Sequence, residues 1–157
     1  MSKFTFFWGT SSPFSNWHKS DFEYKGIKFC TSEQAMMWEK AMTFDDIQIA
    51  QEILKTRNPK VQKELGRNVK NYDEAKWASV RYDIVFNILV NKFTQNESML
   101  LALLETDESL IVEASPYDAV WGIGLAEDDP RAQNISEWKG QNLLGKALTE
   151  LRSVLKQ

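Results

Sequence analysis

The apolar residues of this chain recur mostly at spacings of three and four, the period that places side chains on one face of an α-helix. The longest such segment begins at Asp73, a predicted N-cap, and ends at about Gln95. Its apolar positions are spaced by 3, 4 and 4 residues and predict one broad buried face: Trp77, Val80, Ile84 and Ile88.

The end of the chain has the same pattern. Leucines spaced by 4, 3 and 4 residues predict a helix over about Asn142–Leu155. A shorter helix is predicted over Glu97–Glu105. Both segments therefore add to a largely helical fold.

Polar residues that can cap a helix mark another helix start. Thr31 and Gln34 match the capping-box pattern, in which an N-cap hydroxyl and a side chain three residues later satisfy free backbone N–H groups. The predicted helix runs from there to about Met42. Glu33 then lies in its first turn.

Two further helices follow. Asp45 or Asp46 is the predicted cap of a helix that continues through Leu54. Asn58 followed by Pro59 is typical of a helix start, because proline at the first helical position loses no hydrogen bond. This short helix is predicted to end at Gly66.

A few short segments favour strands. Phe4–Trp8 is rich in aromatic residues, and Phe22–Tyr24 and Ile27–Cys30 flank a two-residue turn and predict a hairpin. Leu110–Glu113 predicts a fourth strand, followed by a loop over Ala114–Ala126. Many helices with a few strands indicate a mostly helical α+β fold.

Composition fits one globular domain. The chain has 157 residues, of which 43% are hydrophobic and 26% charged, and it contains no repeat, low-complexity tract or linker. We therefore expect residues 1–157 to form a single domain. The net charge of −3 excludes a protein whose whole surface is shaped to bind phosphate backbones.

The sequence also indicates the cellular compartment in which we expect the protein. Cys30 is the sole cysteine, so no internal disulfide can form, which fits a reducing compartment. The N-terminal apolar stretch, Phe4–Trp8, is too short for a signal peptide or a membrane span. We expect a cytoplasmic protein with no membrane partner.

Metal and triad chemistry have little support. His18 is the single histidine, which argues against a zinc site or a Ser–His–Asp triad. No phosphate-binding glycine loop or H-E-x-x-H pattern is present. We expect neither a metal nor an organic cofactor.

Three segments combine polar or glycine residues with aromatic residues where the chain turns: Pro13–Trp17, Thr31–Gln34 and Val112–Gly124. Binding and catalytic residues concentrate in such turns on a rigid scaffold. These segments are the predicted location of the site.

The motifs within and around these segments are recognisable in combination. In chain order they are Phe14–Trp17, Thr31–Ala41, Leu65–Arg67, Lys92–Asn96, Ile111–Gly124 and Asn142–Arg152. Together they resemble the YbiA-like, or NADAR, family over nearly the whole chain, from about Phe4 to Leu155. Each motif alone is weak, but six in the family's order are a specific match.

The resemblance implies a mostly helical α+β domain that acts as an N-glycosidase. Some family members are associated with cleaving phosphoribosylamino intermediates of riboflavin synthesis. Others are associated with removing ADP-ribose from guanine, including guanine in DNA. The family's catalytic residues fall on Glu33, Trp77 and Asp118.

Two positions depart from the family's pattern. Ala35 stands where many relatives have an aromatic residue, and Thr149 where relatives often have methionine. Neither changes the two acids. The departures therefore affect the expected substrate more than the reaction class.

The acids suit this chemistry. Breaking a ribose C1′–N bond makes the sugar resemble an oxocarbenium cation, which a carboxylate stabilises while it activates water. A helix N-terminus favours an anion by roughly 0.3–1 kcal/mol, so Glu33 has a reason to be ionised. Asp118 is interpreted as a second carboxylate or as a turn residue, and Trp77 as a pocket wall or as core.

The remaining matched residues are predicted to bind a nucleotide-like small molecule. Cations are candidates for phosphates or the leaving base, and amides for the ribose or base edge. The predicted binding residues are Asn16, Trp17, Lys40, Arg67, Lys92, Ser115, Trp121, Gly122 and Asn142.

The resulting interpretation is an enzyme that removes ADP-ribose from guanine, as a nucleotide or in DNA, or that cleaves a riboflavin-pathway ribosylamino intermediate. Two alternatives stay open. The same pocket would serve a binding module that recognises ADP-ribose or an NAD-related ligand without cleaving it. A helical scaffold whose aromatic residues are only core is the other.

Overall fold

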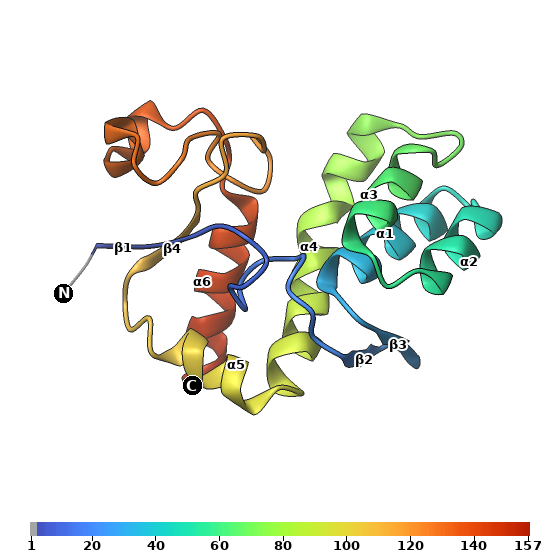
Figure 1. Ribbon diagram of the computed structural model, residues 1–157, viewed down its shortest axis with the longest axis horizontal. Helices are drawn as coiled ribbons and strands as arrows, with labels where there is room; N and C mark the ends of the chain where they lie inside the picture. Colours follow the sequence, from blue (N-terminus) through green and yellow to red (C-terminus); the bar gives the residue numbers. More distant parts are fainter. Residues whose placement is uncertain (1–2) are drawn as a thin grey trace. The chain divides into compact units, whose positions relative to one another are not determined.

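The computed structural model describes residues 3–157 and confirms the mostly helical α+β fold (Figure 1). The chain divides into two compact units, which we describe separately. The internal unit is Asn16–Asn96. The terminal unit combines Met1–Ser15 with Glu97–Gln157. That residues 1–157 form one domain stays a prediction.

The internal unit is a helical bundle with a small hairpin. Its first helix packs against the other three helices, and strand β2 lies against α4 (Figure 1). The two strands form the predicted antiparallel hairpin. The elements are β2 (Phe22–Tyr24), β3 (Ile27–Phe29), α1 (Ser32–Thr43), α2 (Ile47–Lys55), α3 (Pro59–Arg67) and α4 (Glu74–Thr94).

Side chains cap the helices of this unit as the sequence predicts. Thr31, Asp46, Asn58 and Asp73 each accept a hydrogen bond from a backbone N–H group in the first turn that follows. Such bonds satisfy donors that have no partner within the helix, and each is worth about 1 kcal/mol. The helix starts are therefore fixed by local sequence.

Two details of these helices differ from expectation. Gln34 does not close the capping box on Thr31, because its Oε1 accepts the backbone N–H of Cys30 instead. The helix α3 does not end at Gly66 but includes it. Glycine is needed at this position because a side chain here would collide with Met37. Gly66 thus allows α3 to pack closely against α1.

The terminal unit joins both ends of the chain in a two-stranded parallel sheet. Strand β1 (Phe4–Phe7) pairs with β4 (Leu110–Glu113), in register from Phe4 opposite Leu110. Helix α6 (Leu143–Leu155) packs against β4, and α5 (Glu97–Leu104) contacts α6. Two short 3₁₀ helices that the sequence did not predict lie at Pro130–Gln133 and Ile135–Glu137.

Burial of apolar side chains holds this unit together. One part of its core is formed by fully or nearly buried residues from β1, β4, the loop that follows and the first 3₁₀ helix: Phe4, Val112, Ile123, Leu125 and Ala132. Apolar burial contributes roughly 25 cal/mol per Å². The parallel strands leave this core in the same direction, so the loops after β1 and β4 emerge at one edge of the sheet.

Among residues 3–157, no helix has both the length and the apolar character needed to cross a membrane.

Candidate functional site

Glu33 lies in the first turn of α1, as predicted, and its side chain is buried, with 4% exposed. Its backbone N–H donates to the carbonyl of Asn16 at 2.9 Å. The carboxylate is attached to the positive end of the helix dipole, which favours the ionised form. Glu33 therefore does not project into bulk solvent.

Asn16 holds the segment before β2 against the start of α1. Its Oδ1 accepts a hydrogen bond from Ser32 Oγ at 2.8 Å, and the residue is 8% exposed. Its Nδ2 donates to no described residue. The amide therefore fixes the start of α1 with its oxygen and keeps its N–H groups for another acceptor.

Lys92 is fully buried in α4, and its Nζ lies 3.4 Å from Ser32 Oγ. Burial penalises the ammonium form and lowers the pKa of Lys92 to about 7. A lysine in this state exchanges its proton near neutral pH. This property separates it from the other predicted cations.

Lys40 lies two helical turns after Glu33 on α1. Burial lowers the pKa of Lys40, the nearby carboxylates of Glu33 and Glu74 oppose this effect, and Arg67 adds to it. Its Nζ also lies over the ring of Tyr72, 4.6 Å from the centroid. Lys40 thus lies within electrostatic range of Glu33, Glu74 and Arg67.

The predicted cations form two groups rather than one. Lys92 contacts Ser32 at the start of α1, whereas Lys40 is eight residues further along the same helix. At 1.5 Å per residue these positions are about 12 Å apart. We therefore expect Lys92 to serve a different part of the site from Lys40 and Arg67.

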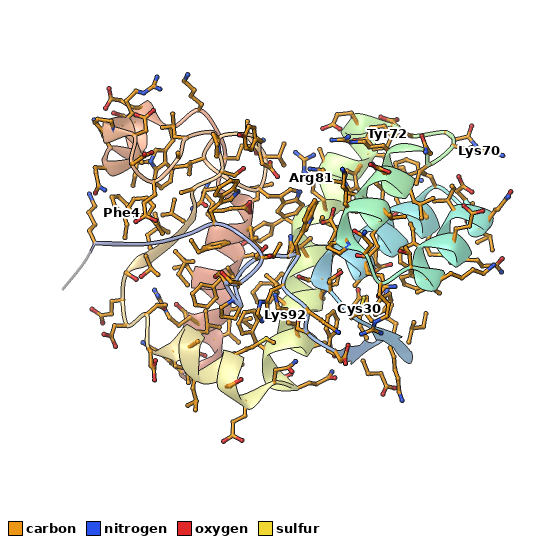
Figure 2. The ribbon with its side chains drawn as sticks, in the orientation of Figure 1. Phe4, Cys30, Lys70, Tyr72, Arg81 and Lys92 are labelled. Carbon is orange, nitrogen blue, oxygen red and sulfur yellow. The ribbon has the colours of Figure 1, made fainter. Side chains whose placement is uncertain are left out.

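Trp77 is buried in the first turn of α4, with 4% exposed. The same face of α4 carries Arg81 one turn later and Lys92 three turns after that, and Figure 2 shows these two side chains at different levels of the helix. The predicted buried face is confirmed in part, but Val80 and Ile84 lie beside it and remain partly exposed. Two cations occupy positions on the buried face.

Sequence reasoning missed Arg81, Tyr72 and Glu74. Arg81 Nη1 contacts Glu74 Oε1 at 3.1 Å, and the Tyr72 hydroxyl donates to the other oxygen of Glu74. These hydrogen bonds lower the pKa of the Glu74 carboxyl. The available signal was the spacing of four between Trp77 and Arg81, which places a cation on the apolar face.

Trp17 is half-buried in the segment before β2, and Lys63 Nζ lies 5.9 Å from the centroid of its ring. This contact comes from α3. The indole is thus partly available on the surface of the internal unit.

Asp118 lies in the loop after β4, in the terminal unit. Its Oδ1 accepts hydrogen bonds from the backbone N–H groups of Val120 at 2.9 Å and Trp121 at 2.8 Å. This is the turn-capping role that the sequence left open. Its Oδ2 has no hydrogen-bond partner among the described residues, so one carboxylate oxygen stays available.

Ser115 has a similar local role. Its Oγ accepts the backbone N–H of Tyr117 at 3.2 Å, and the residue is buried. Together with Asp118 it determines the path of the chain after β4. The loop is therefore held in place by its own side chains.

Trp121 and Gly122 connect this loop to the start of α6. Their carbonyls accept the N–H groups of Leu144 and Asn142. A Cβ atom on Gly122 would lie 2.9 Å from the carbonyl oxygen of Glu113 and 3.0 Å from that of Asp118. Glycine is required here because two backbone segments approach closely.

Replacing Gly122 with alanine is expected to destabilise the protein by about 1–3 kcal/mol, the usual cost of overpacking. The loop backbone must move to relieve the contacts with Glu113 and Asp118. Chemical denaturation of the purified variant measures the loss. Gly9→Ala is the control for steric crowding, because no atom beyond its two chain neighbours lies within 4 Å of its added Cβ, although its positive φ carries its own strain. Equal stability of Gly122→Ala and the native protein would contradict the prediction.

Asn142 differs from expectation. It adopts a left-handed conformation, with φ of 55°, and its side chain does not cap α6. Its Oδ1 accepts the N–H of Glu113 and its Nδ2 donates to the carbonyl of Ile111. The fully buried amide joins α6 to β4, so we assign it a structural role and leave it out of the substrate site.

Two exposed aromatic residues lie beside the Asp118 loop and were also missed. Trp8 follows β1, Tyr117 follows β4, and their ring centroids are 6.1 Å apart. Their exposed fractions are 58% and 86%. The parallel pairing of β1 with β4 brings them together, which no local sequence signal indicates.

The internal unit has two cavities away from the predicted site residues. A cavity of about 460 Å³ is lined by residues that include Phe22, Cys30 and Arg57, and one of about 670 Å³ by residues that include Glu39 and Asn87. Neither is lined by a predicted site residue. Within residues 3–157, no group of three or more His, Cys, Asp or Glu side chains is placed to hold a metal ion.

The chain is similar in sequence to several named proteins. N-glycosidase R617 of Acanthamoeba polyphaga mimivirus is 38% identical, over 96% of this chain and 95% of that protein. Riboflavin biosynthesis protein PYRR, chloroplastic, of Zea mays is 33% identical, over 67% of this chain and 16% of that protein.

The fold is also that of a solved protein. The NMR structure of Escherichia coli YbiA matches with a TM-score of 0.81 and 29% identity, over 99% of this chain and 87% of the other. The sequence profile of the NADAR domain matches residues 6–156. The chain therefore belongs to the NADAR domain family.

Proposed function

We propose that this protein is an N-glycosidase that hydrolyses the bond between a ribose C1′ and a nitrogen in a nucleotide-like conjugate. The observation that carries the proposal is the buried carboxylate of Glu33 at the start of α1, in electrostatic contact with Lys40. Its relatives named N-glycosidase support the reaction class.

In this reaction water is added across the glycosidic bond. As the C1′–N bond breaks, its electron pair leaves with the nitrogen and the sugar becomes positively charged. Glu33 stabilises that charge and accepts a proton from the water that attacks C1′. The leaving nitrogen takes up a proton, so the products are a free base or amine and a ribose with a C1′ hydroxyl.

Asp118 assists in this proposal through its Oδ2, because Oδ1 is already bonded to the loop backbone. That oxygen would bind the attacking water or a ribose hydroxyl. Trp77 would form a wall of the sugar pocket in addition to its role in the core. Asn16 would donate its free amide N–H to the ribose or base edge.

Lys92 suits proton transfer better than permanent phosphate binding. A group whose pKa is about 7 is present in both protonation states near neutral pH, which is the condition for an efficient general acid or base. Lys92 would therefore supply the proton to the leaving nitrogen. Lys40 and Arg67 remain the proposed phosphate-binding cations, and Trp17, Ser115, Trp121 and Gly122 remain proposed substrate-binding residues.

Two substrates fit the proposal. The first is ADP-ribose attached to guanine, as a nucleotide or in DNA, and the second is a phosphoribosylamino intermediate of riboflavin synthesis. The match to the maize riboflavin biosynthesis protein favours the second. The net charge of −3 disfavours tight binding to duplex DNA.

A substrate panel tests the proposal. The protein is incubated with ADP-ribosylated guanine nucleotide, the same adduct in single-stranded DNA, and a phosphoribosylamino pyrimidine, and products are identified by mass spectrometry. We expect release of ADP-ribose or of ribose 5-phosphate from one of them. Binding of intact conjugate with no product after long incubation would favour a binding module instead.

A further inference from the structure

Arg81 is a buried cation for which the fold alone gives no sufficient reason. The residue is 8% exposed, and its Nε is fully buried with no hydrogen-bond partner among the described residues. A buried donor without a partner costs about 1–3 kcal/mol, and native proteins contain few. A position that keeps such a cost calls for a functional explanation.

Among residues 3–157, the Arg81 guanidinium has one side-chain partner, the carboxylate of Glu74, which other groups also contact. Glu74 contacts Arg81 at 3.1 Å and accepts a hydrogen bond from Tyr72. It also lies within electrostatic reach of Lys40. Because the side chain of Glu74 is 65% exposed, water screens its charge and it neutralises Arg81 incompletely.

Other charged residues near Arg81 and Lys40 do not remove the excess of positive charge there. Asp73 faces Tyr72, but its carboxylate caps α4 by accepting the N–H groups of Ala75 and Lys76. Arg67 adds a further positive charge next to Lys40. The cluster of Lys40, Arg67, Tyr72, Glu74 and Arg81 thus offers an anion more donors than it has acceptors.

The place of this cluster relative to Glu33 suits a substrate phosphate. Lys40 is seven residues after Glu33 on α1, which is about 10 Å along the helix axis. The 5′ substituent of a ribose points away from C1′. A sugar whose C1′ lies at Glu33 would therefore direct its 5′-phosphate toward the Lys40 end of α1.

From this geometry we infer that Arg81, together with Lys40, binds the 5′-phosphate of the ribosyl substrate in competition with the Glu74 carboxylate. The inference rests on the proposed function for the position of the sugar, but phosphate binding is measured without turnover. Figure 2 shows Arg81 and Tyr72 near the start of α4, where this cluster lies. Arginine is the residue best suited to bind phosphate with two parallel hydrogen bonds.

Calorimetric titration of the full chain with ribose 5-phosphate, ribose, inorganic phosphate and ADP-ribose tests the inference. Native protein should bind ribose 5-phosphate measurably and ribose at least about tenfold more weakly, the ratio expected for losing charge-assisted hydrogen bonds. Equal affinity for the two sugars would overturn the inference. Tight binding of inorganic phosphate alone would also overturn it, because the site would then recognise phosphate without the ribose.

Variants separate phosphate binding from a structural ion pair. Arg81→Met should weaken ribose 5-phosphate binding about tenfold or more, whereas Glu74→Gln should leave it unchanged or tighten it, because it removes the competing anion. Arg57→Met removes an equal charge from an exposed pair with Asp21 and should change nothing. Equal losses in Arg81→Met and Glu74→Gln would show that the pair acts only structurally, and no loss in Arg81→Met would remove the site.

If Arg81→Met does not fold, as judged by circular dichroism, the binding of ribose 5-phosphate by Glu74→Gln tests the inference. Retained or tighter binding supports the inference and a loss contradicts it. Failure of the proposed function is distinguishable from failure of this inference. In that case no conjugate is hydrolysed, while Arg81-dependent binding of ribose 5-phosphate persists.

Discussion

Replacing Glu33 with glutamine is expected to lower kcat by about a hundred- to ten-thousand-fold, the range for removing a general base, while the protein stays folded. Glutamine has nearly the shape of glutamate but carries no charge and accepts no proton from water. Since Glu33 is buried and its backbone bond to Asn16 is kept, the fold loses little. Single-turnover assays on the substrate identified by the panel measure the effect.

Glu39 provides a matched control on the same helix. Its carboxylate is also buried, accepts a hydrogen bond from the Tyr24 hydroxyl at 2.5 Å and pairs with Lys25 at 2.9 Å. Glu39→Gln should lower stability, because it removes the charge of a buried carboxylate that Tyr24 and Lys25 contact, but should retain turnover. If Glu33→Gln kept full activity, or if both variants lost activity alike, Glu33 would not be the catalytic carboxylate.

Local sequence predicts most of the elements. The N-caps Thr31, Asp46, Asn58 and Asp73 are confirmed because a cap depends on a few neighbouring residues. The hairpin of β2 and β3 is confirmed for the same reason. Elements whose start or turn is decided within about four residues are readable from one sequence.

Contacts between distant segments could not be predicted in this way. The pairing of β1 with β4 joins residues more than a hundred positions apart, and it alone brings Trp8 beside Tyr117. The left-handed backbone of Asn142 likewise depends on the carbonyl of Ile111, to which its amide donates. Patterns of apolar spacing contain no information about such partners.

Some residues of the candidate site could likewise be predicted from the sequence, and others could not. The motifs indicate Glu33, Lys40 and Arg67, and in the structure Lys40 lies within electrostatic range of the other two. Periodicity places Arg81 on the apolar face of α4, but a cation at such a position becomes informative only once its burial and its partner are known. The catalytic pairing of Glu33 with Asp118 and the role of Trp77 stay predictions.

Lys92→Met is expected to make the protein more stable at neutral and acidic pH, by several kcal/mol near pH 6. The pKa of Lys92 is lowered from 10.5 in the unfolded chain to about 7 in the folded protein because the ammonium is buried. Between these values the unfolded state binds more protons than the folded state, so the stability of the native protein rises with pH.

The advantage of the methionine variant should therefore shrink by about 1.4 kcal/mol per pH unit from pH 7 to pH 10.5, and it should be constant below pH 7. Urea denaturation of both proteins from pH 6 to pH 10 measures this difference, and Lys76→Met, an exposed lysine on the same helix, should show no such slope. Turnover should move in the opposite direction, because the variant cannot donate a proton to the leaving nitrogen. Stability curves for native protein and Lys92→Met that run parallel across this range would mean that the pKa of Lys92 is the same in the folded and unfolded states, and its assignment to proton transfer would lose its basis.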